Sequence, residues 1–393
     1  MTEVKFLKLW IKDDEVREYD TVDCIPPGCV VPPRTFNTWQ PYRAATLPPV
    51  PDDQVDELVS PILKHFETVV CATKAEVDYL LAWKAQQIQK PATKSEVGII
   101  LSGPQGAGKN IETSWFADSV LGSNAAYTTS KIQQILGKHS TVLQNKVHVV
   151  LDEANYEALK PFADGIKDLM TGKTLALDPK YKDAFTTRSL VNFTLTTNNA
   201  KSVHLEAGDR RWVVLEVNDS RKGDTAYFDA LAKHLKNDKV ARGFYQYLLK
   251  FDLTEYGNFQ AKRPHTRLYE EMKEENLSTF HSFMSHECIR CAGEKPMFSP
   301  VANEVGCCEE KTKKTPEYPA TAFFETFKTW AAAANHDIGP YTRSKFGLDL
   351  GGLMKKTDSG VVKKRNGQHI VYSVEWSTVE KCLKLHGLFN TNV

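Results

Sequence analysis

The chain has 393 residues, a formal net charge of +1 and 41% hydrophobic residues, which is typical of a globular protein large enough for two or three domains. No apolar run reaches the roughly 18–20 residues of a membrane span and no signal peptide opens the sequence, so we expect a cytoplasmic protein without a membrane partner. The balanced charge excludes a uniformly basic nucleic-acid coat, so any binding of nucleic acid must depend on local patches.

Residues 1–52 are rich in proline and are expected to form an extended arm or linker without a core of its own. A helical segment, residues 53–94, is predicted next. Its apolar residues keep helical spacing from Val55 to Phe66 and again from Val77 to Ile88. These two apolar stripes indicate the core of a helical bundle, with an oligomer contact as the alternative.

A glycine-rich segment, Gly103-x-x-x-x-Gly108-Lys109, follows the short apolar strand Ile99–Leu101 and precedes a helix-compatible stretch. In this order, backbone N–H groups can surround phosphate oxygens while the lysine reaches the terminal phosphates of a nucleotide such as ATP. The expected nucleotide-binding residues are Gly103, Pro104, Gln105, Gly106, Ala107, Gly108, Lys109, Asn110 and Ile111. Asn110 replaces the usual Ser or Thr that ligates Mg²⁺, but an amide oxygen can also bind a hard cation.

Two further strands are expected to end beside this loop. Val147–Leu151 is a buried-strand pattern followed by Asp152 and Glu153, and the strand Leu190–Thr197 precedes Asn198. The carboxyl ends of parallel strands share one edge of a sheet. Asp152 and Asn110 would therefore serve a Mg²⁺ site, Glu153 would polarise the attacking water, and Asn198 would orient it. Strand-end acids can also be caps or surface charges.

Arg210 and Arg211 follow the third strand in a polar loop. They could form salt bridges within their own subunit, or they could reach the nucleotide of a neighbouring subunit and stabilise the charge of the transition state. The second role requires a ring of subunits. Strand and helix patterns alternate throughout this region and residues 225–275 look helical, so residues 95–275 are predicted to form one α/β domain with a largely parallel sheet.

Residues 276–393 are expected to form a separate module. A helical stripe from Phe323 to Ala334 is followed by a second helix, predicted to begin near Thr342 and to be capped by its hydroxyl, and then by a β-hairpin with an Asn366-Gly367 turn. This order predicts a winged helix. Its candidate DNA-binding residues are Arg343, Lys345, Lys363, Lys364 and Arg365, together with Lys355 and Lys356. The alternative is an ordinary solvated face.

The chain contains eight cysteines among its 393 residues, and so few cysteines in so long a chain do not indicate a disulfide scaffold. The pairs Cys288-x-x-Cys291 and Cys307-Cys308 could supply four thiolates to a Zn²⁺ ion. Reduced thiols in a surface loop are the alternative, because adjacent cysteines are awkward ligands for one ion.

The segments Gly103 to Asn110, Val147 to Glu153, Leu190 to Asn199 and Asp209 to Arg211, in this order, resemble superfamily 3 helicases. The likeness is to the D5-like helicase module of phage and plasmid primase-helicases and primase-polymerases. The segments Phe36–Trp39 and Leu81–Pro91 resemble that family's flanking motifs.

The resemblance implies a P-loop ATPase core of the AAA+ type with an N-terminal helical domain and a C-terminal winged helix. It implies ATP and Mg²⁺ as cofactors and a homo-oligomeric ring, usually a hexamer, around single-stranded or forked DNA. It also implies a basic hairpin that projects into the ring, for which the candidates are Lys180, Tyr181 and Lys182. A surface turn with ordinary lysines is the alternative.

We therefore predict an ATP-dependent DNA helicase or translocase that replicates a phage or another mobile element. No primase signature is visible, so a primase or polymerase is expected as a partner protein or as a preceding part of a larger polypeptide. The competing predictions are a non-motor replication initiator and a scaffold for a primase or polymerase. A metabolic P-loop kinase fits the second acid and the arginine pair less well.

Overall fold

The structure is a computed structural model, and it describes residues 9–138, 141–154, 156–181, 183–198, 209–275, 278–292, 315, 317–336, 338–339, 341–366 and 369–389. The chain divides into two compact units. The first comprises Met1–Val203 and Arg210–Tyr269, and the second comprises His204–Asp209 and Glu270–Val393. Among the described helices, none combines the length and the apolar character that crossing a membrane requires.

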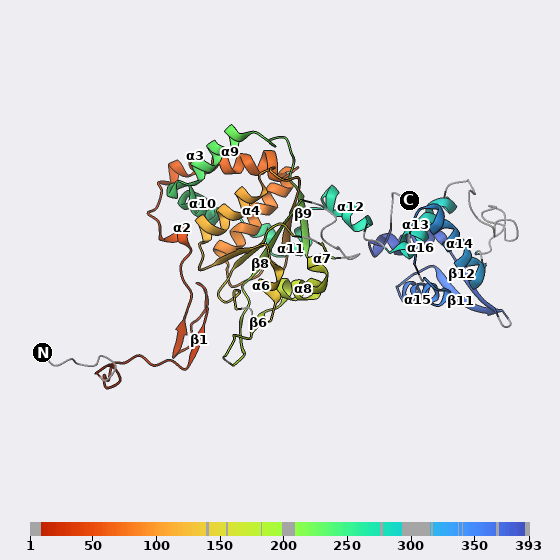
Figure 1. Ribbon diagram of the computed structural model, residues 1–393, viewed down its shortest axis with the longest axis horizontal. Coiled ribbons are helices and arrows are strands. Elements are labelled where there is room, and N and C mark those ends of the chain that lie inside the picture. Colours follow the sequence, from red (N-terminus) through yellow and green to blue (C-terminus); the bar gives the residue numbers. More distant parts are fainter. Residues whose placement is uncertain are drawn as a thin grey trace. The chain divides into compact units, whose positions relative to one another are not determined.

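A five-stranded parallel sheet lies at the centre of the first unit, with the strand order β4-β5-β8-β3-β9 (Figure 1). The strands are β3 (Gly98–Ser102), β4 (Ala126–Thr129), β5 (His148–Leu151), β8 (Asn192–Thr197) and β9 (Trp212–Glu216). β3, β5 and β8 are buried along their whole length, as the apolar runs of a sheet covered on both faces require. The α/β fold with a parallel sheet is thus confirmed.

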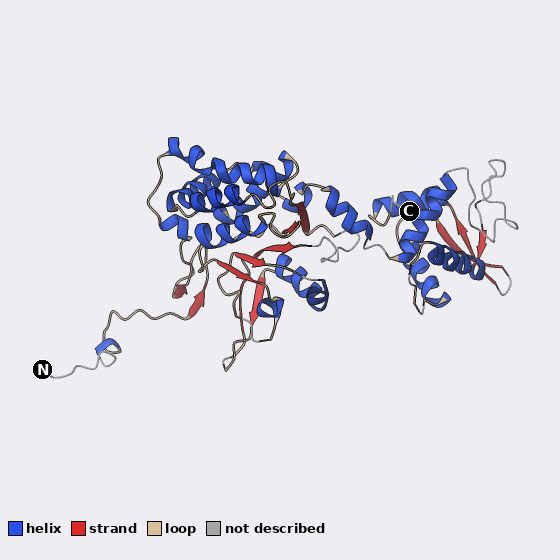
Figure 2. Cartoon of the chain, turned by 45° about the horizontal axis from the view of Figure 1, so that its top comes forward, coloured by secondary structure: helices blue, strands red, loops and turns tan. Residues whose placement is uncertain are grey.

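A large group of helices lies above the strands in the view of Figure 2. The two helices expected from the sequence are α3 (Asp52–His65), which continues as the π-helical turn η1 (Phe66–Val70), and α4 (Lys74–Gln89). α3 buries one face as expected, but α4 is buried on nearly all sides, polar Lys84 and Gln87 included, so the prediction that α4 is amphipathic is wrong. Thr73 caps α4 by accepting a hydrogen bond from the backbone N–H of Glu76. Both helices pack against α10 (Asp238–Lys250). They therefore belong to the same unit as the sheet.

A buried ion pair joins this bundle to the helix that follows the glycine-rich loop. Lys84 of α4 pairs with Glu112 of α5 (Lys109–Trp115), and both side chains are 2% exposed. The Lys84 ammonium also lies 4.0 Å from the ring centroid of Phe116, at the start of η2 (Phe116–Leu121). Two buried charges are tolerated only when they are paired, so this contact fixes α5 relative to α4.

The proline-rich segment contributes to the first unit. Its strands β1 (Thr21–Asp23) and β2 (Thr35–Asn37) pair in parallel, and the short helix α2 (Arg43–Thr46) follows. Tyr42 is 3% exposed and donates its hydroxyl to the carbonyl of Gln87 at 2.7 Å. The end of the arm is thus packed into the core beside α4.

The remaining elements of the first unit surround the sheet. They are α6 (Ile132–Leu136), α7 (Tyr156–Leu159), η3 (Lys160–Phe162), α8 (Ala163–Thr171), β6 (Thr174–Leu177), β7 (Phe185–Arg188), α9 (Thr225–Leu235), η5 (Thr254–Tyr256) and α11 (Phe259–Lys262). β6 and β7 form an antiparallel hairpin that lies between β5 and β8 in the sequence. α12 (Arg267–Glu275) spans the division between the two units.

The second unit contains α13 (Thr279–Ala292), β10 (Glu317–Pro319), α14 (Ala320–Ala333), α15 (Arg343–Met354), β11 (Val361–Asn366), β12 (His369–Val374) and α16 (Trp376–Leu385). The strands form an antiparallel sheet of order β10-β12-β11. The predicted cap is present, because the Thr342 hydroxyl accepts a hydrogen bond from the Lys345 N–H at 3.2 Å. The predicted hairpin is present too, with Asn366 paired to His369, while Gly367 lies outside the described residues.

Candidate functional site

The glycine-rich loop connects the end of β3 to the start of α5, at the carboxyl edge of the parallel sheet. A Cβ atom on Gly103 would lie 2.4 Å from the carbonyl oxygen of Val217, so the close passage of the chain after β9 excludes a side chain there. Gly108 has φ +98° and precedes the first residue of α5. Only glycine adopts that conformation without strain, and it turns the backbone into the helix. The first backbone N–H groups of α5 therefore remain available to an anion.

Lys109 is the first residue of α5, and its side chain reaches back to the loop. Its ammonium donates hydrogen bonds to the carbonyls of Gly103 at 2.6 Å and Pro104 at 2.8 Å, and to Oδ1 of Asn198 at 2.9 Å. Partial burial lowers the pKa of Lys109, and the carboxylates of Asp152 and Glu153 oppose this shift. The loop lysine and the residue at the tip of β8 are thus in direct contact.

The two acids follow β5, which is separated from β3 by β8. Asp152 continues the ladder, since its N–H donates to the carbonyl of Thr129 at 2.8 Å. Glu153 has φ +54°, a left-handed conformation that is uncommon for a residue with a side chain. Strained residues of this kind cluster at functional sites, where the surrounding contacts hold them in place.

Thr196 of β8 supplies those contacts. Its hydroxyl donates to Oδ1 of Asp152 and accepts a hydrogen bond from the Glu153 N–H at 3.0 Å. Its carbonyl accepts from the Ala154 N–H at 2.8 Å. Sequence reasoning missed Thr196, although it lies two residues before Asn198 on an alternating strand, a spacing that could have indicated it.

Asn110 contacts the second oxygen of Asp152, with its amide nitrogen 2.8 Å from Oδ2. The oxygens of a carboxylate, an amide and a hydroxyl, as carried by Asp152, Asn110 and Thr196, are the donor set that hard divalent cations prefer. In this structure the amide nitrogen of Asn110 faces Asp152. Rotation of the Asn110 side-chain amide by 180° would bring its oxygen to the same place, where it could bind a cation. These residues could therefore hold Mg²⁺ beside the phosphates of a nucleotide.

A cavity of about 330 Å³ lies over these groups. It is lined by Gln105, Gly106, Gly108, Lys109, Asn110, Ile111, Glu153, Thr196, Asn198 and Phe228. Among the lining residues, Lys109, Glu153 and Asn198 are the groups suited to phosphate, and the apolar side chains Ile111 and Phe228 are suited to contact a nucleoside. Phe228 is on α9, and nothing in the sequence pattern could have placed that helix beside the loop.

His65 packs against the glycine-rich loop at Gly108. A Cβ atom on Gly108 would lie 3.1 Å from Cε1 of His65 and 2.7 Å from the ring of Phe228, so the two rings leave no space for a side chain. His65 Nδ1 is 3.0 Å from the hydroxyl of Tyr227. Burial lowers the pKa of His65 to about 4. A neutral imidazole therefore packs against the turn into α5.

A second cavity in the first unit is larger, at about 1000 Å³, and lies away from the glycine-rich loop. It is bounded by the N-terminal arm, residues 92–96 and the β6–β7 hairpin. Its three cations, Lys94, Lys173 and Arg188, are matched by three acids, and Lys94 is already bonded to two carbonyls and a hydroxyl. Only the smaller cavity brings a lysine, a carboxylate and an amide together, so we assign the candidate site there.

Arg210 and Arg211 precede β9. Arg210 is exposed and Arg211 is partly buried, and the carbonyl of Arg211 accepts a hydrogen bond from the Gly98 N–H at 2.7 Å. Their predicted action on the nucleotide of a neighbouring subunit concerns an assembly of several chains and stays a prediction.

The predicted basic hairpin is formed by β6 and β7. Tyr181 in its turn is 90% exposed and has φ +64°, and the Lys180 ammonium lies 5.0 Å from its ring centroid. Lys182 lies outside the described residues. An exposed aromatic ring and a cation thus lie together in the loop of the hairpin, and their contact with nucleic acid stays a prediction.

The candidate zinc ligands are only partly described. Cys288 of α13 is 2% exposed, and burial raises the pKa of its thiol to about 12. Its sulfur lies 3.7 Å from the carbonyl of Trp376. Cys307 and Cys308 lie outside the described residues. Within the described residues, no three His, Cys, Asp or Glu side chains are arranged to hold a metal ion, and the zinc site stays a prediction.

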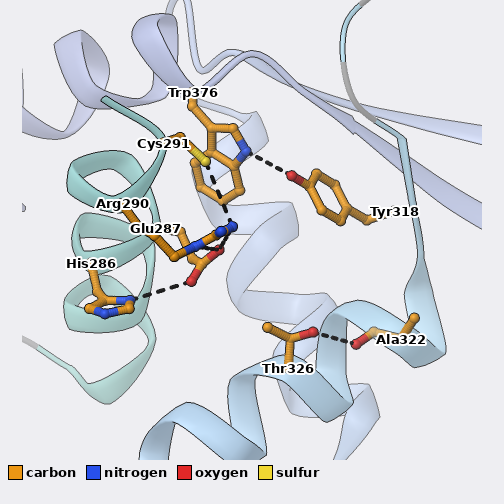
Figure 3. A network of polar contacts seen from close by, with 8 residues as sticks. All are labelled: His286, Glu287, Arg290, Cys291, Tyr318, Ala322, Thr326 and Trp376. Atoms are coloured by element: carbon orange, nitrogen blue, oxygen red, sulfur yellow. Dashed lines mark hydrogen bonds and ion pairs between the residues drawn. The ribbon is translucent and has the colours of Figure 1, made fainter. Parts of the chain in front are cut away.

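Figure 3 shows the polar network around Cys291. Glu287 is 3% exposed and pairs with Arg290 at 2.7 Å and with His286 at 3.3 Å. Burial alone would raise the pKa of Glu287, but the hydrogen bonds from Arg290 and the nearby His286 outweigh it and hold that pKa below its ordinary value. The Arg290 guanidinium also lies 3.8 Å from the sulfur of Cys291. These contacts all join residues of α13 to one another, so they stabilise the last turns of this helix.

The basic residues of the second unit differ in their surroundings. Arg343 donates to the Thr321 hydroxyl at 3.2 Å, and Lys345 pairs with Asp349 at 3.0 Å. Lys364 pairs with Glu317 at 2.7 Å. Lys363 and Arg365 are exposed, and no ion pair within the described residues holds either of them.

Residues 101–211, which include the loop, both acids and the arginine pair, match the model of a family of unknown function (DUF5906). No curated protein matches the chain in sequence. Solved structures of similar fold include the apo structure of the NrS-1 C terminal region (305-718), with 17% identity and a TM-score of 0.62 over 90% of this chain and 84% of that chain. An A form apo structure of the same region has 15% identity and a TM-score of 0.59 over the same shares. A further A form apo structure has 17% identity and a TM-score of 0.58 over 87% of this chain and 80% of that chain. The chain therefore has the fold of the NrS-1 C terminal region.

Proposed function

We propose that the chain is an ATP-dependent DNA helicase or translocase of superfamily 3 that acts in the replication of a phage or another mobile element. The observation that carries this proposal is the contact of Lys109 with Asn198, beside Asp152 and Glu153, at the carboxyl edge of one parallel sheet. An AAA+ type ATPase needs these groups together, because the loop holds the phosphates while the strand tips act on the terminal one.

Each residue has a distinct part in the proposed hydrolysis. Lys109 and the backbone of the glycine-rich loop bind and orient the phosphates. Glu153 accepts a proton from the attacking water, whose oxygen forms a bond to the γ-phosphorus while the bond to the β-phosphate oxygen breaks. The products are ADP and inorganic phosphate. Bound Mg²⁺, held by Asp152 and Asn110, would neutralise phosphate charge, and Asn198 would orient the water.

The assembly that follows from this proposal is a ring, in hexameric form, with Arg210 of one subunit completing the site of the next. The exposed pair Lys180 and Tyr181 would contact single-stranded DNA, through the phosphate backbone and by stacking. Hydrolysis would move these hairpins along the strand. A primase or polymerase is the proposed partner in replication.

A non-motor replication initiator is the second candidate. The observation that favours it is the order of the second unit, in which helices α14 and α15 precede an antiparallel hairpin with basic residues, as in a winged helix. In that case nucleotide would control assembly, and the second unit would recognise an origin.

The test is ATPase activity of the purified full chain with and without single-stranded DNA, together with the mass of the assembly in the presence of ATP. The motor predicts stimulation of several-fold and an assembly of about six chains. An initiator predicts slow hydrolysis that single-stranded DNA does not change, with tight binding to one duplex sequence. Absence of ATP binding in the folded protein would contradict both.

A further inference from the structure

The hairpin β11–β12 has two faces with different charge environments. Cross-strand partners share a face, so Val361, Lys363 and Arg365 lie on the same side as their partners Val374, Tyr372 and Ile370. Val361, Tyr372 and Val374 are in the core of the second unit. Lys363 and Arg365 therefore continue the core face beyond the point where the core ends, and both are exposed.

α15 lies on this same face. A Cβ atom on Gly347 would be 3.8 Å from the hydroxyl of Tyr372, the cross-strand partner of Lys363. Lys363 and Arg365 thus extend from the side of the hairpin that faces α15. Lys364 points to the opposite side, where Glu317, which pairs with Ser373, neutralises it at 2.7 Å. The three consecutive cations are consequently not equivalent.

The exposed face of α15 has few groups that could distinguish bases. Ser344, Leu348 and Gly352 follow one another at intervals of four residues, and Leu348 is 72% exposed. Hydrogen-bonding readout in the major groove uses long polar side chains such as Arg, Asn and Gln. The two cations in the first turn are held by protein groups, Arg343 by Thr321 and Lys345 by Asp349.

We propose that this face of the second unit holds duplex DNA through its phosphate backbone and without preference for sequence. The contacts come from Lys363 and Arg365 on one side and from Lys355 at the end of α15 on the other. Asp349 of α15 is already engaged by Lys345 and by the hydroxyl of Tyr341. An uncompensated positive surface beside an apolar helix face suits a polyanion whose bases are not read. The inference refines the proposed action on DNA and rests on it.

The test is equilibrium binding of the full chain to two blunt duplexes of unrelated sequence, measured by fluorescence anisotropy over a range of salt concentrations. The double variant Lys363→Ala/Arg365→Ala should bind both duplexes roughly 10–100-fold more weakly, with a salt dependence smaller by about two counterions. The matched control Lys364→Ala removes a cation from the other face and should bind within about 2-fold of the wild type. Thermal unfolding of all three proteins should be alike.

Three results would overturn the proposal. One is a loss for Lys364→Ala equal to that of the double variant. Another is a preference above about 10-fold for a single sequence when the chain selects from a random duplex pool. The third is tighter binding to an RNA duplex than to a DNA duplex of the same sequence. ATPase activity separates this proposal from the one above, because uniform duplex binding without hydrolysis would uphold the docking surface and remove the motor.

Discussion

The edge of the parallel sheet in the first unit and the basic hairpin face in the second unit differ in how their functional side chains are held. At the sheet edge, Asp152, Thr196 and Asn110 are joined by direct hydrogen bonds. On the hairpin face, Lys363 and Arg365 are exposed cations held by no ion pair of the described residues. Chemistry on a phosphate requires groups fixed within fractions of an ångström, whereas a phosphate backbone is bound by charge alone. Substitutions should therefore be costly at the first place and graded at the second.

The largest effect is expected for Lys109→Ala. The variant removes the ammonium that contacts Gly103, Pro104 and Asn198, and with it the charge expected to hold the terminal phosphates. Hydrolysis should fall by at least about 1000-fold and ATP affinity should fall too. Lys131→Ala, which removes an exposed lysine of the same unit, should hydrolyse ATP as the wild type does. Equal activity of the two variants would contradict the assignment of Lys109 to phosphate binding.

Thr196→Val tests whether the Thr196 hydroxyl holds the two acids at the sheet edge. Valine keeps the shape of the side chain but cannot donate to Asp152 or accept from the Glu153 N–H. We expect kcat to fall about 10–100-fold with little change in KM, because binding groups remain while the acids lose their support. Thr194→Val, on the same buried strand two residues earlier, is the control. A loss confined to thermal stability in Thr196→Val would show that the hydroxyl is only structural.

Substitutions in the β6–β7 hairpin of the first unit should have graded effects, like those on the basic face of the β11–β12 hairpin, because the side chains concerned are exposed. Lys180→Ala/Tyr181→Ala removes an exposed cation and a 90% exposed ring, so folding and DNA-free hydrolysis should be unchanged. Stimulation of the ATPase by single-stranded DNA should require roughly 10-fold more DNA, since stacking contributes about 1–3 kcal/mol per base. Unaltered stimulation would remove the hairpin from the DNA path.

The smallest effect concerns stability and comes from His65, which packs against Gly108. Its folded-state pKa of about 4 lies below the unfolded value of about 6.5, so the unfolded chain binds more protons between these values. The contribution to stability is complete above about pH 6.5 and is lost as the pH falls toward 4, by about 2 kcal/mol between pH 7 and 5. Urea unfolding of the wild type and of His65→Asn at both pH values measures it. An identical pH dependence in the two proteins would contradict the assignment, with buried His148 contributing equally to both.

The sequence predicted the elements whose signals are local. The strand before Gly103, the cap at Thr342 and the hairpin from Val361 to Val374 all follow from apolar runs and turn residues within a few positions. Asp152 and Glu153 could be placed beside Lys109 only because parallel strands share their carboxyl edge. The strand, the cap and the hairpin did not depend on how distant segments pack, whereas the placement of the acids assumed that distant strands share one parallel sheet.

What the sequence could not predict depends on contacts between distant segments. Phe228 and His65 contact the loop at Gly108 from helices far away in the sequence, since His65 precedes Gly108 by 43 positions and Phe228 follows it by 120. The burial of Tyr42 against Gln87 likewise has no local signal, so the end of the arm looked like a linker. The separate faces of Lys363 and Lys364 follow only from the observed strand register.

The substitution Glu153→Gln is the decisive test of ATP hydrolysis at this site. The substitution keeps the size and the backbone contacts of the residue but removes the carboxylate that would accept the proton of the attacking water. We predict that the purified variant binds ATP with an affinity close to that of the wild type and turns it over at least about 1000 times more slowly. Turnover like that of the wild type in a folded variant that binds ATP would contradict the assignment of Glu153 and, with it, the proposed motor site.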